Sequence, residues 1–179
     1  MLRGFHNTWM NATHPGLFPS LEFLGSASKY VSEIFDLIDH IPIFEDLKLS
    51  EIESLCGFMD CFGAPRDTTL FTDGQEGYFL LIILTGKIQV VKHARIIATV
   101  GPGATLGEMS LIDGEPRFAS CITVEPTDFA ILTRQAMIDI MLNMPRLGNK
   151  LLLVLLQMMT RRLRETSNNL LPHIASIHV

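Results

Sequence analysis

Between Cys61 and Leu132, glycine recurs at short intervals and divides the chain into short apolar runs. These glycines are Gly63, Gly74, Gly77, Gly86, Gly101, Gly103, Gly107 and Gly114. The runs between them include residues 79–84, 87–91 and 96–100. Short strands with turn signals roughly every eight to twelve residues are typical of a small antiparallel barrel or jelly roll. We therefore predict an α+β fold whose β-roll spans residues 61–132.

The region before the roll divides into an arm and two helices. Residues 1–26 contain glycine, proline, asparagine and scattered aromatic residues without periodicity, so we expect an irregular arm. This arm is expected to dock through an aromatic residue, namely Trp9, Phe18 or Phe23. Over residues 27–58 we predict helices, because apolar residues recur at helical spacing over 27–39 and again over 49–58.

The region after the roll predicts two further helices over residues 133–170, followed by a tail over 171–179. Thr133 is a suitable N-cap for a short helix, because its hydroxyl can accept from a backbone N–H. Pro145 marks the start of a long helix, since proline is favoured in the first helical turn.

The long helix carries a heptad pattern. Apolar or small residues repeat in alternating steps of four and three: Leu152, Leu156, Met159, Leu163, Thr166 and Leu170. Such a seam either packs on the protein's own roll or joins two copies in a coiled coil. We favour a homodimer, because residues 151–156 are apolar on more faces than one roll can cover.

The stretch from Leu106 to Cys121 has the composition of an anion site. Gly107-Glu108 precedes Pro116-Arg117, with a short apolar segment and a turn between them. A glycine beside a helical turn lets backbone N–H groups approach an anion closely. Arg117 can bind two phosphate oxygens at once, whereas a carboxylate such as Glu108 accepts a hydrogen bond from a sugar hydroxyl. Together, the arginine and the carboxylate indicate a nucleotide site. The alternative is that they form a surface ion pair flanking a hairpin.

This stretch resembles the phosphate-binding cassette of cyclic-nucleotide-binding domains, in which Gly-Glu is followed by a variable loop and Pro-Arg-x-Ala. Gly74-x-x-Gly77, Thr85-Gly86 and Gly101-Pro102-Gly103 also resemble turns of that family's roll. The resemblance covers about residues 40–170 and implies a cyclic-nucleotide-binding domain over 27–170. The ligand-binding residues that it implies in the cassette are Gly107, Glu108, Met109, Ser110, Arg117, Phe118 and Ala119.

The purine would need further contacts. Val90 and Ile97 of the roll are expected to form an apolar wall. The run Arg161-Arg162-Leu163 is followed by Thr166 and Ser167, as in the catabolite activator branch of the family, which implies that these two hydroxyl residues contact the base. The alternative is that Thr166 is only a small residue of the heptad seam.

The identity of the base is suggested by Phe118. In cGMP-selective members of the family a hydroxyl residue follows the cassette arginine, and Phe118 has none. The resemblance therefore implies that cAMP is preferred, with cGMP as the alternative.

The function predicted from these features is a stand-alone cyclic-nucleotide sensor. Its C-terminal helix would close on the ligand and relay binding to an unknown effector protein or a second subunit. We expect no enzymatic activity, cofactor, metal or DNA-reading domain. One rival is a ligand-free assembly module on the same fold. Another is a cupin-like enzyme, which is disfavoured because His93 is the roll's single histidine.

Composition limits the location and the partners. The net charge of −5 argues against general nucleic-acid binding. No apolar run approaches the ~20 residues of a membrane helix, and the N-terminus does not resemble a signal peptide. We therefore expect a cytoplasmic protein without membrane contact. Its three cysteines, Cys56, Cys61 and Cys121, are expected to be reduced core residues.

Overall fold

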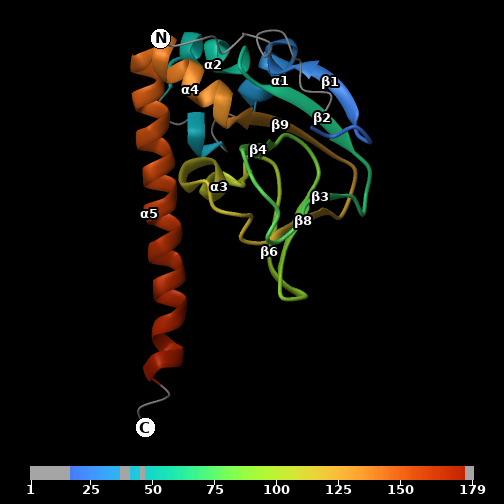
Figure 1. Ribbon diagram of the computed structural model, residues 1–179, viewed down its shortest axis with the longest axis vertical. Helices are drawn as coiled ribbons and strands as arrows, with labels where there is room; N and C mark the ends of the chain where they lie inside the picture. The colour runs from blue at the N-terminus through green and yellow to red at the C-terminus, as the bar shows by residue number, and fades with distance from the viewer. Residues whose placement is uncertain (1–16, 37–40, 45–46, 176–179) are drawn as a thin grey trace, which may run out of the picture.

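The computed structural model describes residues 17–36, 41–44 and 47–175, which form two antiparallel sheets and a group of helices (Figure 1). The first sheet has the order β1 (Glu22–Ser26), β2 (Asp60–Ala64), β9 (Thr127–Thr133), β4 (Phe79–Ile83) and β7 (Thr105–Leu106). The second has the order β3 (Thr69–Phe71), β8 (Ser120–Thr123), β5 (Ile88–Lys92) and β6 (Arg95–Val100). The predicted α+β class and antiparallel roll are confirmed.

The helices pack on the outer face of the first sheet. They are the 3₁₀ turns Ala27–Tyr30 and Pro42–Phe44 and the α-helices α1 (Val31–Asp36), α2 (Leu49–Cys56), α3 (Glu108–Asp113), α4 (Arg134–Asn143) and α5 (Pro145–Ala175). Thr133 caps α4 as predicted, since its hydroxyl accepts from the backbone N–H of Ala136 at 3.1 Å. The end of the helix predicted over 27–39 lies outside the described residues.

The central strand β9 divides its side chains between two cores, as the alternation of a strand requires. Phe129 and Ile131 point into the core between the two sheets. Ala130 and Leu132 point to the opposite face and pack with the helices. The first sheet is therefore covered on both faces, and the helical layer is joined directly to the roll.

The N-terminal arm is more ordered than predicted. Residues 22–26 form β1, which pairs with β2, so the prediction of an irregular segment over 1–26 is wrong for this stretch. A strand of five residues shows too little alternation to be recognised without its partner. Phe18 is buried and contacts the rings of Phe62, Phe79 and Phe129 edge-on, with centroids 5.3–5.6 Å apart. Trp9 lies outside the described residues.

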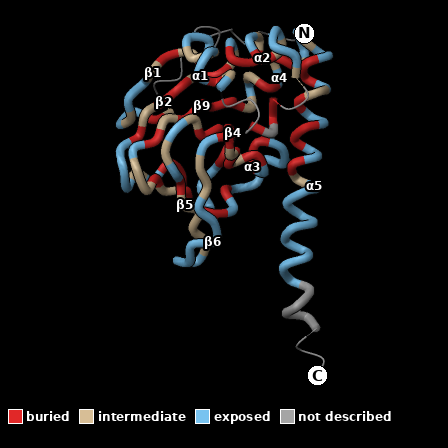
Figure 2. The backbone as a smooth tube through the Cα atoms, turned by 180° about the vertical axis from the view of Figure 1, so that it is seen from behind, coloured by how far each residue is buried: buried red, intermediate tan, exposed pale blue. Residues whose placement is uncertain are grey.

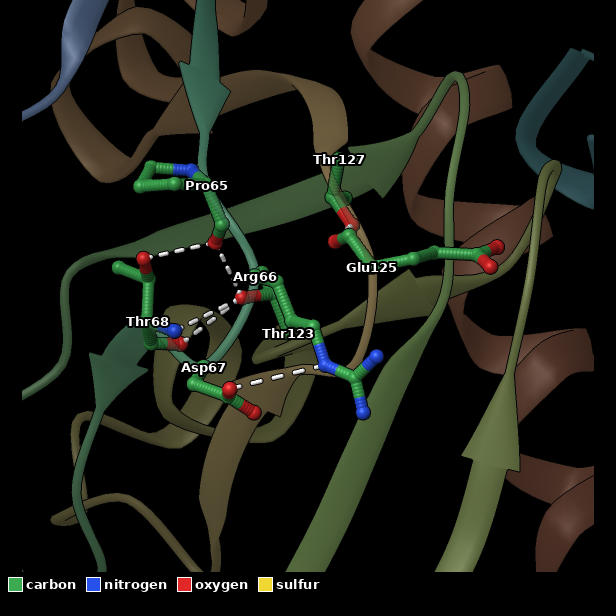
Figure 3. A network of polar contacts seen from close by, with 7 residues as sticks. All are labelled: Pro65, Arg66, Asp67, Thr68, Thr123, Glu125 and Thr127. Carbon is green, nitrogen blue, oxygen red and sulfur yellow. Dashed lines mark hydrogen bonds and ion pairs between the residues drawn. The ribbon is translucent and has the colours of Figure 1, made fainter.

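A polar network fastens the loop between β2 and β3 to the end of β8 (Figure 3). The buried Thr123 hydroxyl donates to the carbonyl of Pro65 at 2.7 Å and accepts from the backbone N–H of Thr68 at 2.9 Å. The Thr68 hydroxyl donates to the same Pro65 carbonyl at 2.7 Å. These bonds satisfy the buried hydroxyl of Thr123 and tie the loop to the strand that follows Arg117.

The long helix α5 starts at Pro145 as predicted but continues to Ala175, past the predicted end at 170. Its first half packs against the domain through Leu147, Leu151, Val154, Leu155 and Met158. Its second half runs beyond the body of the domain, and residues 160–170 are exposed (Figures 1 and 2). In the described residues, no helix combines the length and the apolar character needed to cross a membrane.

The heptad seam is largely exposed. Leu152, Leu156, Leu163 and Leu170 are between 43% and 67% exposed, although each is apolar. The alternative in which the protein's own roll buries the whole seam is therefore wrong. Four leucines at heptad spacing form an apolar stripe that is available to a partner.

Candidate functional site

The site is built on the short helix α3 and the loop that leads from it to β8. Gly107, which precedes α3, has a φ of +83°, a conformation that side-chain-bearing residues rarely adopt. A Cβ added there would collide with Nη1 of Arg117. Glycine is thus required at this position both by the backbone turn and by the close approach of the arginine.

Arg117 is buried, with 2% of its surface exposed. Its Nη1 donates to the carbonyl oxygens of Phe79 at 2.8 Å and Gly107 at 3.0 Å. Its Nε and Nη2, which share one edge of the planar guanidinium, have no hydrogen-bond partner. Burial lowers the pKa of Arg117 to about 10, which leaves the side chain charged at neutral pH. A buried cation with one unpaired edge is a binding group for an anion.

Glu108 is the first residue of α3 and is also 2% exposed. Its Oε1 forms an ion pair with Nη1 of Arg162, which reaches across from α5. Nη2 of Arg162 also donates to the carbonyl of Thr105 at 2.7 Å. Oε2 of Glu108 has no partner and can accept a hydrogen bond. Burial raises the pKa of Glu108, and Arg162 opposes this shift.

These groups line a cavity of about 90 Å³. Eight predicted residues lie around it: Val90, Gly107, Glu108, Met109, Ser110, Arg117, Phe118 and Ala119. Four further lining residues were not predicted: Phe71, Leu106, Cys121 and Arg162. Among the buried side-chain nitrogen and oxygen atoms of the described residues, those without a partner belong to Thr105, Glu108 and Arg117. The unpaired polar atoms are therefore concentrated at the cassette.

Three predicted residues do not line this cavity. Ile97 lies on the edge strand β6 and is exposed, so its predicted place in the pocket wall is wrong for this cavity. Thr166 and Ser167 are exposed residues of α5. Their expected contact with the base came from the resemblance of the run after Arg161-Arg162-Leu163 to the catabolite activator branch, and it stays a prediction.

Phe118 points outward, with 55% of its surface exposed. The Nζ atom of Lys92 lies 4.7 Å from the ring centroid and also pairs with Asp73 at 2.8 Å. Phe118 therefore forms part of the cavity's mouth without filling the cavity.

A family model described as the cyclic nucleotide-binding domain matches residues 63–144. A solved cyclic nucleotide-binding domain from Methylobacillus flagellatus is 47% identical to this chain, with a TM-score of 0.79. That alignment covers 88% of this chain and 92% of the other. The chain belongs to the cyclic nucleotide-binding domain family. The family predicted from the cassette is thereby confirmed.

Longer regulators are also related to this domain. The chain is 30% identical over 140 residues to the CRP-like cAMP-activated global transcriptional regulator of Mycobacterium tuberculosis, covering 75% of this chain and 61% of that protein. It is 30% identical over 129 residues to the cyclic AMP receptor protein of Thermus thermophilus, covering 69% and 58%. The chain thus spans about three-fifths of the length of these curated relatives.

The raised pKa of Glu108 predicts a pH-dependent stability. Just above pH 4.5, the usual pKa of this group, the folded protein keeps a proton that the unfolded chain has lost. The free energy of unfolding should therefore fall as the pH rises through this interval. Glu108→Gln lacks this contribution, so its stability relative to wild type should increase with pH. Urea unfolding of both proteins between about pH 4.5 and 7 measures the difference.

Arg162→Gln provides the matched variant. Because Arg162 lowers the pKa of Glu108, its removal should extend the loss of stability to higher pH. If wild type and Glu108→Gln gave parallel stability curves, the raised pKa of Glu108 would be contradicted.

Proposed function

We propose that this domain is a cAMP sensor in which Arg117 binds the cyclic phosphate and Glu108 accepts a hydrogen bond from the ribose hydroxyl. The observation that carries the proposal is the set of unpaired polar atoms at the cassette: Nε and Nη2 of Arg117 and Oε2 of Glu108. Leaving a buried polar group without a partner is unfavourable, so these atoms favour a ligand that supplies both an anion and a hydroxyl donor. A cyclic nucleotide has both.

The proposed signal passes through α5. The cavity of about 90 Å³ is smaller than the roughly 300–1,000 Å³ of most small-molecule sites, so a whole nucleotide requires a rearrangement. Arg162 lines the cavity and joins α5 to Glu108. A ligand that changes the environment of Glu108 would therefore reposition α5, which then closes over the purine.

The partner proposed for α5 is a second copy of the chain. Leu156 and Leu163 lie seven residues apart, on one face of the helix, and are both more than 60% exposed. A parallel coiled coil would bury this stripe in a homodimer. The dimer, or an effector protein that reads α5, would then receive the signal.

A second candidate function is a ligand-free assembly module. It is favoured by the ion pair between Glu108 and Arg162, because that contact already occupies one oxygen of the carboxylate. The two functions differ in whether a cyclic nucleotide stabilises the fold.

The first prediction of this proposal is that cAMP stabilises the wild-type fold against unfolding and that Arg117→Ala abolishes this effect. At one hundred times Kd, a ligand adds about 2.7 kcal/mol to the free energy of unfolding. Removing one partner of a buried ion pair typically costs about 3–5 kcal/mol. Loss of the Arg117 guanidinium should therefore raise the Kd for cAMP by about two to three orders of magnitude or more. Thermal unfolding and calorimetry with cAMP measure both. Arg66→Ala, which removes an exposed arginine, is the control. Equal affinity in wild type and Arg117→Ala would reject this site, and the absence of stabilisation in wild type would favour the assembly module.

The second prediction is that cAMP binds about tenfold more tightly than cGMP. Phe118 offers no hydroxyl to guanine, and closure of α5 would bring Thr166 and Ser167 to the adenine, a difference of about one hydrogen bond or ~1–1.5 kcal/mol. Replacing both Thr166 and Ser167 by alanine should reduce this preference. Competition titrations with the two nucleotides on both proteins test it. Equal affinities in wild type would contradict the preference.

The third prediction concerns the homodimer. The double variant Leu156→Glu, Leu163→Glu should be monomeric at concentrations at which wild type is dimeric, because charges would enter the apolar seam. Light scattering coupled to size-exclusion chromatography measures the mass. Leu142→Glu is the matched control, since Leu142 is equally apolar and exposed but lies on α4. A monomeric wild type at tens of micromolar would overturn the homodimer.

A further inference from the structure

The guanidinium of Arg117 lies against two aromatic rings. Its Cζ is 4.2 Å from the ring centroid of Phe71 and 4.3 Å from that of Phe79. The two ring planes are inclined at 75°, and their centroids are 6.1 Å apart. Because Phe71 lies on β3 and Phe79 on β4, the rings come from different sheets. Together they form a corner in which the guanidinium sits.

The remaining sides of the arginine are also fixed. Its Nη1 is bonded to the two carbonyl oxygens described above. A Cβ added to Gly77 would lie 2.6 Å from Nε and 2.8 Å from Cδ, so the backbone of Gly77 packs closely against the side chain. Within the described part of the chain, no carboxylate forms an ion pair with Arg117. The charge of Glu108 also stabilises the guanidinium from nearby, and the faces of the two rings add favourable contacts to it directly.

We propose that Phe71 and Phe79 are positioning residues for phosphate binding, because their rings hold the Arg117 guanidinium in place before the ligand arrives. The inference rests on the proposed function and adds two residues that raise the affinity of Arg117 for the phosphate. A preorganised cation binds an anion more tightly, since no side-chain freedom is lost on binding. Cation–π contacts strengthen when they are desolvated, as they are here.

Phe79 gives the cleaner test of the two rings. Phe71 lines the cavity and would touch a ligand, whereas Phe79 is not among the residues that line it. Phe79→Leu removes the ring and leaves the backbone carbonyl that binds Nη1. Phe129→Leu is the matched control, because Phe129 belongs to the same aromatic core and contacts the same Phe18 ring. Among the described residues, the cation–π contacts and hydrogen bonds of Arg117 do not involve Phe129.

The binding experiment compares cAMP with adenosine, which lacks the phosphate, by calorimetry on the 179-residue wild type and its variants. Phe79→Leu and Phe71→Leu should each weaken cAMP binding about tenfold, equivalent to about 1.4 kcal/mol. For Phe79→Leu, adenosine affinity should be unchanged. Phe129→Leu should lower the unfolding temperature and leave both affinities as in wild type. An unchanged cAMP affinity in Phe79→Leu, or an equal loss for cAMP and adenosine, would overturn the inference.

A second readout needs no ligand. In the NMR spectrum, the Nε–H resonance of Arg117, identified by its absence in Arg117→Ala, should be displaced by the ring currents of the two phenylalanines. Phe71→Leu and Phe79→Leu should both return it toward the position of a free arginine, and Phe129→Leu should leave it in place. An undisplaced resonance in wild type would overturn the inference. Failure of wild type to bind any cyclic nucleotide would instead overturn the proposed function.

Discussion

The burial of one guanidinium determines much of the architecture of this domain. Removing a charge from water is unfavourable unless other groups replace the lost hydration. Around Arg117, two carbonyl oxygens and two aromatic rings do so. The arrangement also requires glycine at positions 77 and 107, where any side chain would collide with the arginine. The burial of this cation thus depends together on the glycine turns, the aromatic core and the cassette.

Glu108 is a buried group of the opposite charge, and its ion pair connects the roll to α5. Glu108 begins α3, and its charge is balanced by Arg162, 54 residues further along the chain. Among the described contacts, a second link between α5 and the rest of the domain is the ion pair of Lys150 with Glu51 of α2, at 2.7 Å. The first half of α5 is additionally held by apolar packing, whereas Arg162 belongs to the exposed half. Among the described contacts, Arg162 thus links the exposed half of α5 to the cassette through Glu108 and Thr105.

The sequence was sufficient to predict most of the fold and two thirds of the residues that line the cavity. Apolar runs between glycines located β4, β5 and β6, and the cap at Thr133 and Pro145 located the starts of α4 and α5. The cassette residues were predicted because they lie within one short stretch of sequence. Phe71 and Arg162 were not assigned to the site because they reach it from distant elements, and no local spacing carries that information. Strand β1 was missed for the same reason, since its hydrogen bonds are made to a partner far along the chain.

Two faces of α5 carry groups with different surroundings. Successive residues of an α-helix are rotated by about 100°, so Arg162 and its neighbour Leu163 point in different directions. Arg162 faces the cassette, while Leu163 is 67% exposed and belongs to the heptad stripe. A rotation of the free half of α5 that releases Arg162 from Glu108 therefore also turns the stripe. A ligand shifts such an equilibrium only by its difference in affinity for the two positions of the helix. Under the function proposed above, that difference would depend on whether Glu108 is held by Arg162 alone or also accepts a hydrogen bond from a hydroxyl of the ligand.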